Sequence, residues 1–196
     1  MRISGHVETR DLAGVLRGHR ETIHPLAYLR DTQATAPDKA LRKLAQSVGT
    51  HDDALDLAHR LSAAVNEAIA FRPGVTQART TAAEALALGE GVCQDHAHAL
   101  IALARLRDLP ARYVSGYLHS TQDGQPHEAA HAWAEIHVSN LGWVGFDAAN
   151  GCCPDERYVR LGSGLDATDA APIRGVAMGS GAERLAVTVQ VEEMAQ

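Results

Sequence analysis

Residues 89–98 read Gly-Glu-Gly-Val-Cys-Gln-Asp-His-Ala-His, and in this stretch a glycine-rich turn opens directly into a helical pattern. The glycines predict a turn, and the Ala- and Leu-rich pattern after them predicts a helix from Cys93 to about Asp108. Leu109-Pro110 should end that helix, because the following segment, 111–118, is rich in Tyr and Val and is typical of a strand. Helices therefore precede strands, which favours an α+β domain with N-terminal helices packed on an antiparallel sheet.

Three further helices are expected before residue 89. The first, over 37–49, has Pro37 in a position that suits N1 and a glycine at its end. The second, over 52–72, carries one apolar stripe and stops at a Pro-Gly pair. The third, over 81–89, starts with the capping box Thr-Ala-Ala-Glu and ends at a glycine. Residues 1–36 give only a weak signal.

The second half of the chain predicts strands joined by turns. His131–Val138 alternates, with His, Trp and Glu on one face and Ala, Ile and Val on the other. Asn140-Leu141-Gly142 is short enough to form a hairpin into Trp143–Asp147. The remaining expected features are a turn at 122–124, a strand at 157–161, a long loop at 162–181 and a final strand at 185–191.

Length and composition exclude several classes of protein. A chain of 196 residues with 45% hydrophobic and 21% charged residues predicts one globular domain. No apolar run reaches the ~18–20 residues of a membrane span, and the N-terminus lacks the apolar segment of a signal peptide. A net charge of −6 argues against a nucleic-acid partner. Three cysteines, two of them adjacent, do not suggest a disulfide framework, so we expect a reducing cytoplasm.

Three residues form a candidate nucleophilic site. Cys93 is predicted at a helix N-terminus, where unpaired backbone N–H groups and the helix dipole favour the thiolate. His131 and Asp147 supply the two other groups that a thiol nucleophile needs: a base for its proton and a carboxylate to orient the base. In the expected hairpin Asp147 ends one strand and His131 begins the other, so their side chains could meet.

Other reactive residues favour structural roles. Cys152 and Cys153 are adjacent and lack the spacing of a zinc site, so we expect buried or half-buried structural thiols. His96 and His98 are two positions apart and would diverge on a helix, so we expect no metal and no cofactor. Trp133 and Trp143 are expected in the core and in the wall of the site. Glu135 lies on the same face as His131, which leaves open a supporting role or simple solvation.

Four blocks of sequence resemble the transglutaminase-like cysteine hydrolase family of bacteria. They are Gly91-Val92-Cys93, the nine residues 109–117 (Leu-Pro-Ala-Arg-Tyr-Val-Ser-Gly-Tyr), His131-Ala132-Trp133-Ala134-Glu135, and the six residues 142–147 (Gly-Trp-Val-Gly-Phe-Asp). The resemblance covers residues 80–162 and implies a papain-like core with Cys93 as nucleophile, His131 as general base and acid, and Asp147 as orienter. It further implies that residues 1–36 are a remnant of an N-terminal domain or a truncated one, and that 37–196 form the catalytic domain.

This chain departs from the family pattern in two places. Ala148-Ala149 follows Asp147 where the family has Pro-Thr, which should leave the turn less rigid. His96 stands where close relatives often have an aromatic residue such as Phe.

The resemblance implies hydrolysis of a peptide, isopeptide or side-chain amide bond in a peptide or protein, through a thioester on Cys93. The Cys93 backbone N–H is expected to form half of an oxyanion hole. Two alternatives remain open: a transglutaminase, in which an amine resolves the thioester, and a catalytically silent interaction module. Nothing in the sequence suggests a calcium site, which favours hydrolysis.

Overall fold

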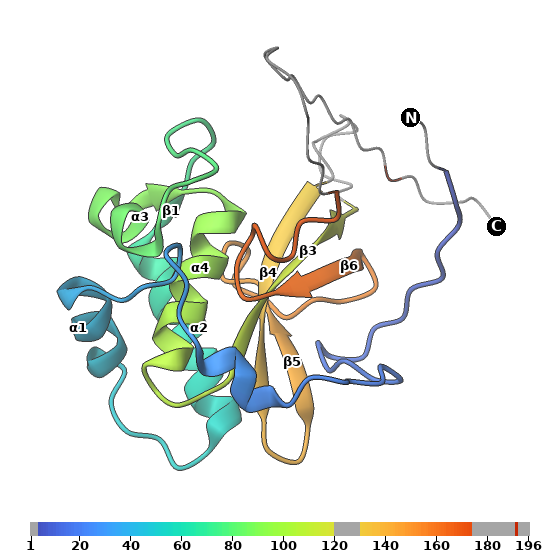
Figure 1. Cartoon of the computed structure of the whole chain (residues 1–196), viewed down its shortest axis with the longest axis horizontal. Helices are drawn as coiled ribbons and strands as arrows, with labels where there is room; N and C mark the ends of the chain where they lie inside the picture. The colour runs from blue at the N-terminus through green and yellow to red at the C-terminus, as the bar shows by residue number, and fades with distance from the viewer. Residues whose placement is uncertain (1–3, 120–129, 174–190, 192–196) are drawn as a thin grey trace.

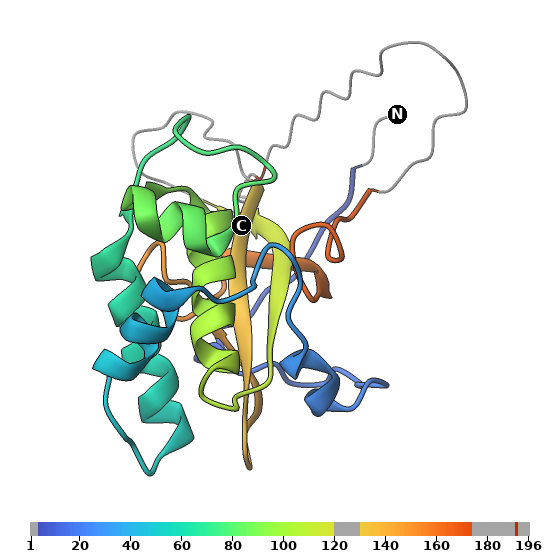
Figure 2. The same ribbon diagram turned by 60° about the vertical axis from the view of Figure 1, so that its left-hand side comes forward.

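The chain forms an α+β structure in which helices pack on one side of an antiparallel sheet (Figures 1 and 2), as the sequence predicts. The computed structural model describes residues 4–119, 130–173 and 191. The predicted turn at 122–124 and, apart from Val191, the predicted strand at 185–191 lie outside the described residues.

The four predicted helices are present, and α3 and α4 begin where the sequence predicts. They are α1 (Lys39–Ser47), α2 (Ala54–Ala68), α3 (Ala82–Leu88) and α4 (Cys93–Arg105), with a short 3-10 helix, η1, at Pro25–Leu29. Thr81 and Glu84 form the predicted capping box of α3, and Gly89 ends it with φ of +70°. Two details were predicted wrongly. Asp38 is the N-cap of α1, so Pro37 precedes the helix, and α4 ends at Arg105, three residues early.

The main sheet has four strands in the order β5-β4-β3-β6. They are β3 (Ala111–Leu118), β4 (Ala130–Val138), β5 (Gly142–Phe146) and β6 (Tyr158–Gly164), and each neighbouring pair is antiparallel. β6 extends beyond the prediction into the expected loop. A Cβ at Gly164 would lie 2.6 Å from the backbone of Asp169, so a glycine here allows the next segment to fold back closely.

Two strands of two residues each were not predicted. β1 (Ala70–Phe71) follows α2 and pairs in parallel with β2 (Glu90–Gly91), which leads directly to Cys93. The pair fixes the approach to α4: the Arg72 N–H donates to the Gly91 carbonyl at 2.7 Å.

Helix α4 forms the centre of the core. The sequence predicts one buried stripe, but every residue from Asp95 to Arg105 is buried. The reason is its position: α1, α2 and α3 contact one side of α4, and β3 and β4 contact the other. Ala132, Ala134 and Ile136 of β4 face this core, whereas Trp133 packs with Val114 and Tyr158 on the opposite side of the sheet, as the alternation predicts.

The N-terminal segment packs against the edge of the sheet. Leu16 N–H donates to the Trp143 carbonyl at 2.9 Å, and Gly145 N–H donates to the Gly14 carbonyl at 2.8 Å. The division into 1–36 and 37–196 stays a prediction. Within 4–119 and 130–173, no helix has the length and apolar character needed to span a membrane.

Candidate active site

Cys93 is the first residue of α4, so its backbone N–H has no partner inside the helix. Asp95 holds the turn before it: its carboxylate accepts hydrogen bonds from the Val92 N–H at 2.8 Å and the Thr76 hydroxyl at 2.7 Å. Gly91 is needed for this approach, because a Cβ there would lie 2.8 Å from the Asp95 side chain. The turn and the neighbouring loop therefore fix the half-buried thiol at the helix N-terminus.

His131 and Asp147 meet across the sheet. His131 Nε2 lies 2.6 Å from Asp147 Oδ2, the contact that the sequence predicts, and the aspartate is 1% exposed. His131 comes from the start of β4 and Asp147 from the residue after β5. Because Nε2 is engaged by the carboxylate, Nδ1 is the ring nitrogen left for Cys93.

The electrostatics couple these three side chains. Burial alone would lower the pKa of His131. The hydrogen bonds that His131 makes to Asp147 and Cys93, together with the charges of these two residues, outweigh burial and raise the pKa to about 9. Burial would raise the pKa of Asp147, but the hydrogen bond and charge of His131 keep that pKa below its ordinary value. The arrangement favours an imidazolium beside the Asp147 carboxylate. Catalytic roles for the three residues stay a prediction.

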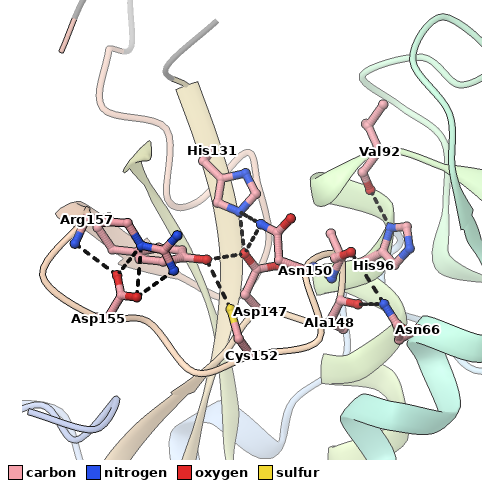
Figure 3. Close-up of polar contacts among 12 residues, drawn as sticks. Asn66, Val92, His96, His131, Asp147, Ala148, Asn150, Cys152, Asp155 and Arg157 are labelled. Atoms are coloured by element: carbon pink, nitrogen blue, oxygen red, sulfur yellow. Dashed lines mark hydrogen bonds and ion pairs between the residues drawn. The ribbon is translucent and has the colours of Figure 1, made fainter. Parts of the chain in front are cut away.

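Further donors surround the Asp147 carboxylate. Asn150 Nδ2 donates to Oδ2 at 2.7 Å (Figure 3). The Tyr158 hydroxyl donates to the same oxygen at 2.8 Å. The backbone N–H groups of Ala149 and Asn150 donate to Oδ1 at 3.0 and 3.2 Å. Asn66 of α2 donates to the Ala148 carbonyl at 2.7 Å and ties this turn to the helical layer.

Sequence reasoning did not single out Asn66, Asn150 or Tyr158. Asn150 sits three residues after Asp147, and that spacing is a usable signal because an aspartate often accepts hydrogen bonds from the next residues of a turn. Asn66 and Tyr158 come from other elements, so only the tertiary structure brings them to the site.

Cys152 and Cys153 lie beside the site without joining it. Asp147 and Cys152 form an isolated antiparallel bridge, with N···O distances of 2.8 and 3.2 Å. Burial raises the pKa of Cys152, and burial together with Cys152 raises the pKa of Cys153. Cys152 Sγ lies 3.4 Å from the Tyr158 hydroxyl. Both thiols are free and half-buried.

The two helix histidines point to different partners. His96 is buried, and its Nδ1 lies 2.9 Å from the Val92 carbonyl (Figure 3). Its Nε2 lies 2.8 Å from the Ile69 carbonyl. His98 accepts a hydrogen bond from the Ala167 N–H at 3.1 Å, and burial lowers its pKa to about 4. Each ring therefore has its own structural partners in the core.

Glu135 binds arginines and not the imidazole. Its carboxylate accepts hydrogen bonds from Arg112 Nε and Arg160 Nε, both at 2.7 Å. Arg112 also pairs with Glu21 and lies over the Trp143 ring, 3.9 Å from its centroid. This buried network joins the N-terminal segment to three strands, which gives Glu135 a structural role.

Two mycobacterial proteins are similar in sequence to this chain. A protein of Mycobacterium leprae is 39% identical over 129 residues, which are 64% of this chain and 46% of that protein. A protein of Mycobacterium tuberculosis is 38% identical over 117 residues, 54% of this chain and 37% of that one. The chain therefore spans less than half the length of these relatives, both of which are uncharacterized.

Two solved structures share the fold. A candidate cysteine protease from Cytophaga hutchinsonii superposes with a TM-score of 0.66 and 27% identity, over 81% of this chain and 53% of that one. The periplasmic domain of TgpA from Pseudomonas aeruginosa bound to ethylmercury superposes with a TM-score of 0.51 and 25% identity, over 66% and 50% of the two chains. Residues 42–148 match the sequence profile of the transglutaminase-like superfamily, which covers more than half of the chain. The protein belongs to the transglutaminase-like superfamily.

Proposed function

We propose that this protein is a cysteine-dependent hydrolase that cleaves a peptide, isopeptide or side-chain amide bond through a thioester on Cys93. The observation that carries the proposal is the position of His131. Its Nε2 is held by a buried carboxylate, and its pKa is raised by both Asp147 and Cys93, so the imidazolium can stabilise a thiolate at the start of α4.

The proposed reaction has two halves. The Cys93 sulfur attacks the carbonyl carbon, and the oxyanion that forms accepts a hydrogen bond from the Cys93 backbone N–H. The C–N bond then breaks as the leaving amine takes the proton from His131, which leaves a thioester. Water attacks the thioester and gives a proton to His131, and the C–S bond breaks to release the carboxylic acid and restore the Cys93 thiolate beside the imidazolium. Asp147 keeps the imidazole oriented through both halves.

Two alternatives use the same residues differently. A transglutaminase would pass the acyl group from Cys93 to a primary amine instead of water, and a silent interaction module would keep the fold without turnover. The similarity to the Cytophaga hutchinsonii protein supports the hydrolase. The paired Asp147 and His131 argue against the silent module, because a buried carboxylate–imidazole contact is costly to keep without a use. We also propose a cytoplasmic location, on the cysteine usage alone.

Labelling and turnover test the proposal together. We expect iodoacetamide at pH 6 to alkylate Cys93 faster than Cys152 and Cys153, as peptide mass mapping would measure. His131→Ala should remove this selectivity. Cys152→Ala is the matched control, because it removes a thiol but leaves the Cys93 pair intact. Equal labelling of all three thiols, unchanged in His131→Ala, would refute the proposal.

Peptide and isopeptide substrates then separate hydrolysis from transfer. The hydrolase releases an acid and an amine at a rate that Cys93→Ala abolishes, and an added primary amine leaves the acid as the main product. Product that carries the added amine would identify a transglutaminase. Selective labelling without turnover on either substrate class would favour the silent module.

A further inference from the structure

The Asp147 carboxylate has more donors than orienting a histidine requires. Oδ2 accepts from His131 Nε2, Asn150 Nδ2 and the Tyr158 hydroxyl at 2.6, 2.7 and 2.8 Å. In Figure 3 the His131 ring and the Asn150 amide both point to this carboxylate. Two side chains other than the histidine therefore contact the oxygen that holds the imidazole.

Tyr158 is held rigidly in this position. It is 7% exposed, and its ring packs edge-on against Trp133 at 5.5 Å and lies 5.8 Å from the His131 ring. Burial and the charge of Asp147 raise the pKa of Tyr158 far above its ordinary value, so the phenol keeps its proton. A phenol has one hydrogen to donate, and the carboxylate is its stronger acceptor. The Cys152 thiol, 3.4 Å away, then acts as donor to the phenol oxygen.

These contacts have two consequences for the carboxylate. Donors from a strand, β6, and from the turn at 150 fix its orientation, and with it the plane of the imidazole. Because each donor stabilises the charged form, the carboxylate also resists protonation as the pH falls. Both effects keep Nδ1 of His131 directed to Cys93.

We propose that Tyr158 is a positioning residue of this site, acting through Asp147, and that Asn150 is a second one. The inference rests on the proposed function for its catalytic meaning, but not for its physical test. The proposed positioning role does not require Tyr158 or Asn150 to contact the substrate.

Tyr158→Phe tests the proposal with little change in packing, because it removes one hydroxyl and keeps the ring. Tyr28→Phe is the matched control: Tyr28 is also buried, but its ring packs against Trp143, away from the site. The first readout is the rate constant of Cys93 alkylation by iodoacetamide as a function of pH. The second is the exchange of the His131 Nε2 proton with solvent, measured by NMR.

We expect Tyr158→Phe to slow alkylation at pH 6 about tenfold, since a hydrogen bond to a charged group is lost. The Tyr158 hydrogen bond lowers the pKa of Asp147, so this pKa should rise when the hydroxyl is removed. The acid limb of the pH profile of Cys93 alkylation should therefore move to higher pH in Tyr158→Phe. Exchange of the Nε2 proton should also be about tenfold faster. Asn150→Ala, at an exposed residue that should not affect folding, is expected to change both readouts in the same direction.

The outcomes separate this inference from the proposed function. If wild-type Cys93 alkylation depends on His131 while Tyr158→Phe and Asn150→Ala match Tyr28→Phe in both readouts, the positioning role is wrong and the proposed function stands. If alkylation of the wild type does not depend on His131, the proposed function fails. Proton exchange then decides the inference alone: unchanged exchange in both variants would overturn it, and faster exchange would support it.

Discussion

Replacing Glu135 by glutamine tests whether the buried arginine network stabilises the fold without serving the site. Glu135 is 3% exposed and Arg112 is 1% exposed, so their ion pair is shielded from solvent. Arg160 makes two more hydrogen bonds to the same carboxylate, at 2.7 and 3.1 Å. With Glu21 the cluster holds two positive and two negative charges, and Glu135→Gln leaves one positive charge in excess.

The loss of stability in Glu135→Gln follows from the burial of the Glu135–Arg112 ion pair. Removing one partner of a buried ion pair costs about 3–5 kcal/mol, because the other charge is left without compensation. Arg112 keeps Glu21 and the Trp143 ring as partners, so the lower end, about 3 kcal/mol, is expected for Glu135→Gln. For a chain of this size that corresponds to a fall in Tm of about 6–12 °C.

Urea unfolding at pH 7 with calorimetry measures this loss, and the outer members of the network provide the controls. Glu21 has a side chain that is 23% exposed, so Glu21→Gln should cost only about 1 kcal/mol. The loss in Glu135→Gln should persist in 0.5 M salt, because buried pairs are weakly screened. A loss below about 1 kcal/mol, or equal losses in the two variants, would refute the reasoning.

The same variant separates structure from function. Glu135 contacts arginines and not His131, so folded Glu135→Gln should alkylate at Cys93 with the wild-type pH profile. Asp147→Asn, which changes the direct partner of the imidazole, should lose the selectivity for Cys93. Loss of the selectivity for Cys93 in folded Glu135→Gln would show that Glu135 also helps to orient the imidazole.

Three other perturbations have defined outcomes. The raised pKa of His131 contributes stability that is fully present below about pH 6.5 and lost as the pH rises through about 9. Between pH 6.5 and pH 9 the free energy of unfolding in urea should fall by up to about 3 kcal/mol more for wild type than for His131→Ala. The same dependence of this free energy on pH in both proteins would contradict the prediction. Gly116→Ala should cost about 1–3 kcal/mol, because its Cβ would overlap the backbone oxygen of Val159, whereas Gly5→Ala, in open space, should leave Tm unchanged. Arg105→Met should lower stability by about 3 kcal/mol or more, since Arg105 makes four buried or part-buried hydrogen bonds; a loss under 1 kcal/mol would contradict it.

Features fixed by short stretches of sequence were predictable. The capping box of α3, its left-handed glycine and the hairpin at Asn140 depend on neighbouring residues, and each lies where the pattern indicates. The alternation in β4 correctly separated the core-facing alanines from Trp133. The contact of His131 with Asp147 was within reach because one hairpin joins their strands.

Features that depend on tertiary packing were not predictable. β1 and β2 have two residues each, too few for an alternating pattern, and they pair across 20 positions of sequence. The residues of α4 outside the predicted stripe include Asp95, His96, His98 and Arg105, which read as a polar face. Each is buried because it has hydrogen-bonding partners in other elements, such as Thr76, Ile69, Ala167 and Tyr28.

The turn after Asp147 shows how polar contacts can replace a rigid residue. Ala148-Ala149 stands where the family has Pro-Thr, and a looser turn was expected there. Asn66 instead holds the Ala148 carbonyl from α2, and the aspartate itself accepts two backbone N–H groups of the turn. Of these contacts, only the one from Asn66 depends on the packing of α2 against the turn, and the lower rigidity of the turn stays a prediction.

A carboxylate held in this way limits what it can do in the proposed reaction. With three donors on Oδ2 and two on Oδ1, Asp147 has its charge stabilised on both oxygens, so it is a poor acceptor for the proton of His131. The proton that leaves Cys93 must then stay on the imidazole, and it is the imidazole that can deliver it to the leaving amine. Removing a donor would let Asp147 compete for that proton. Substitution of Tyr158 or Asn150 should therefore alter the pH dependence of Cys93 alkylation as well as its rate.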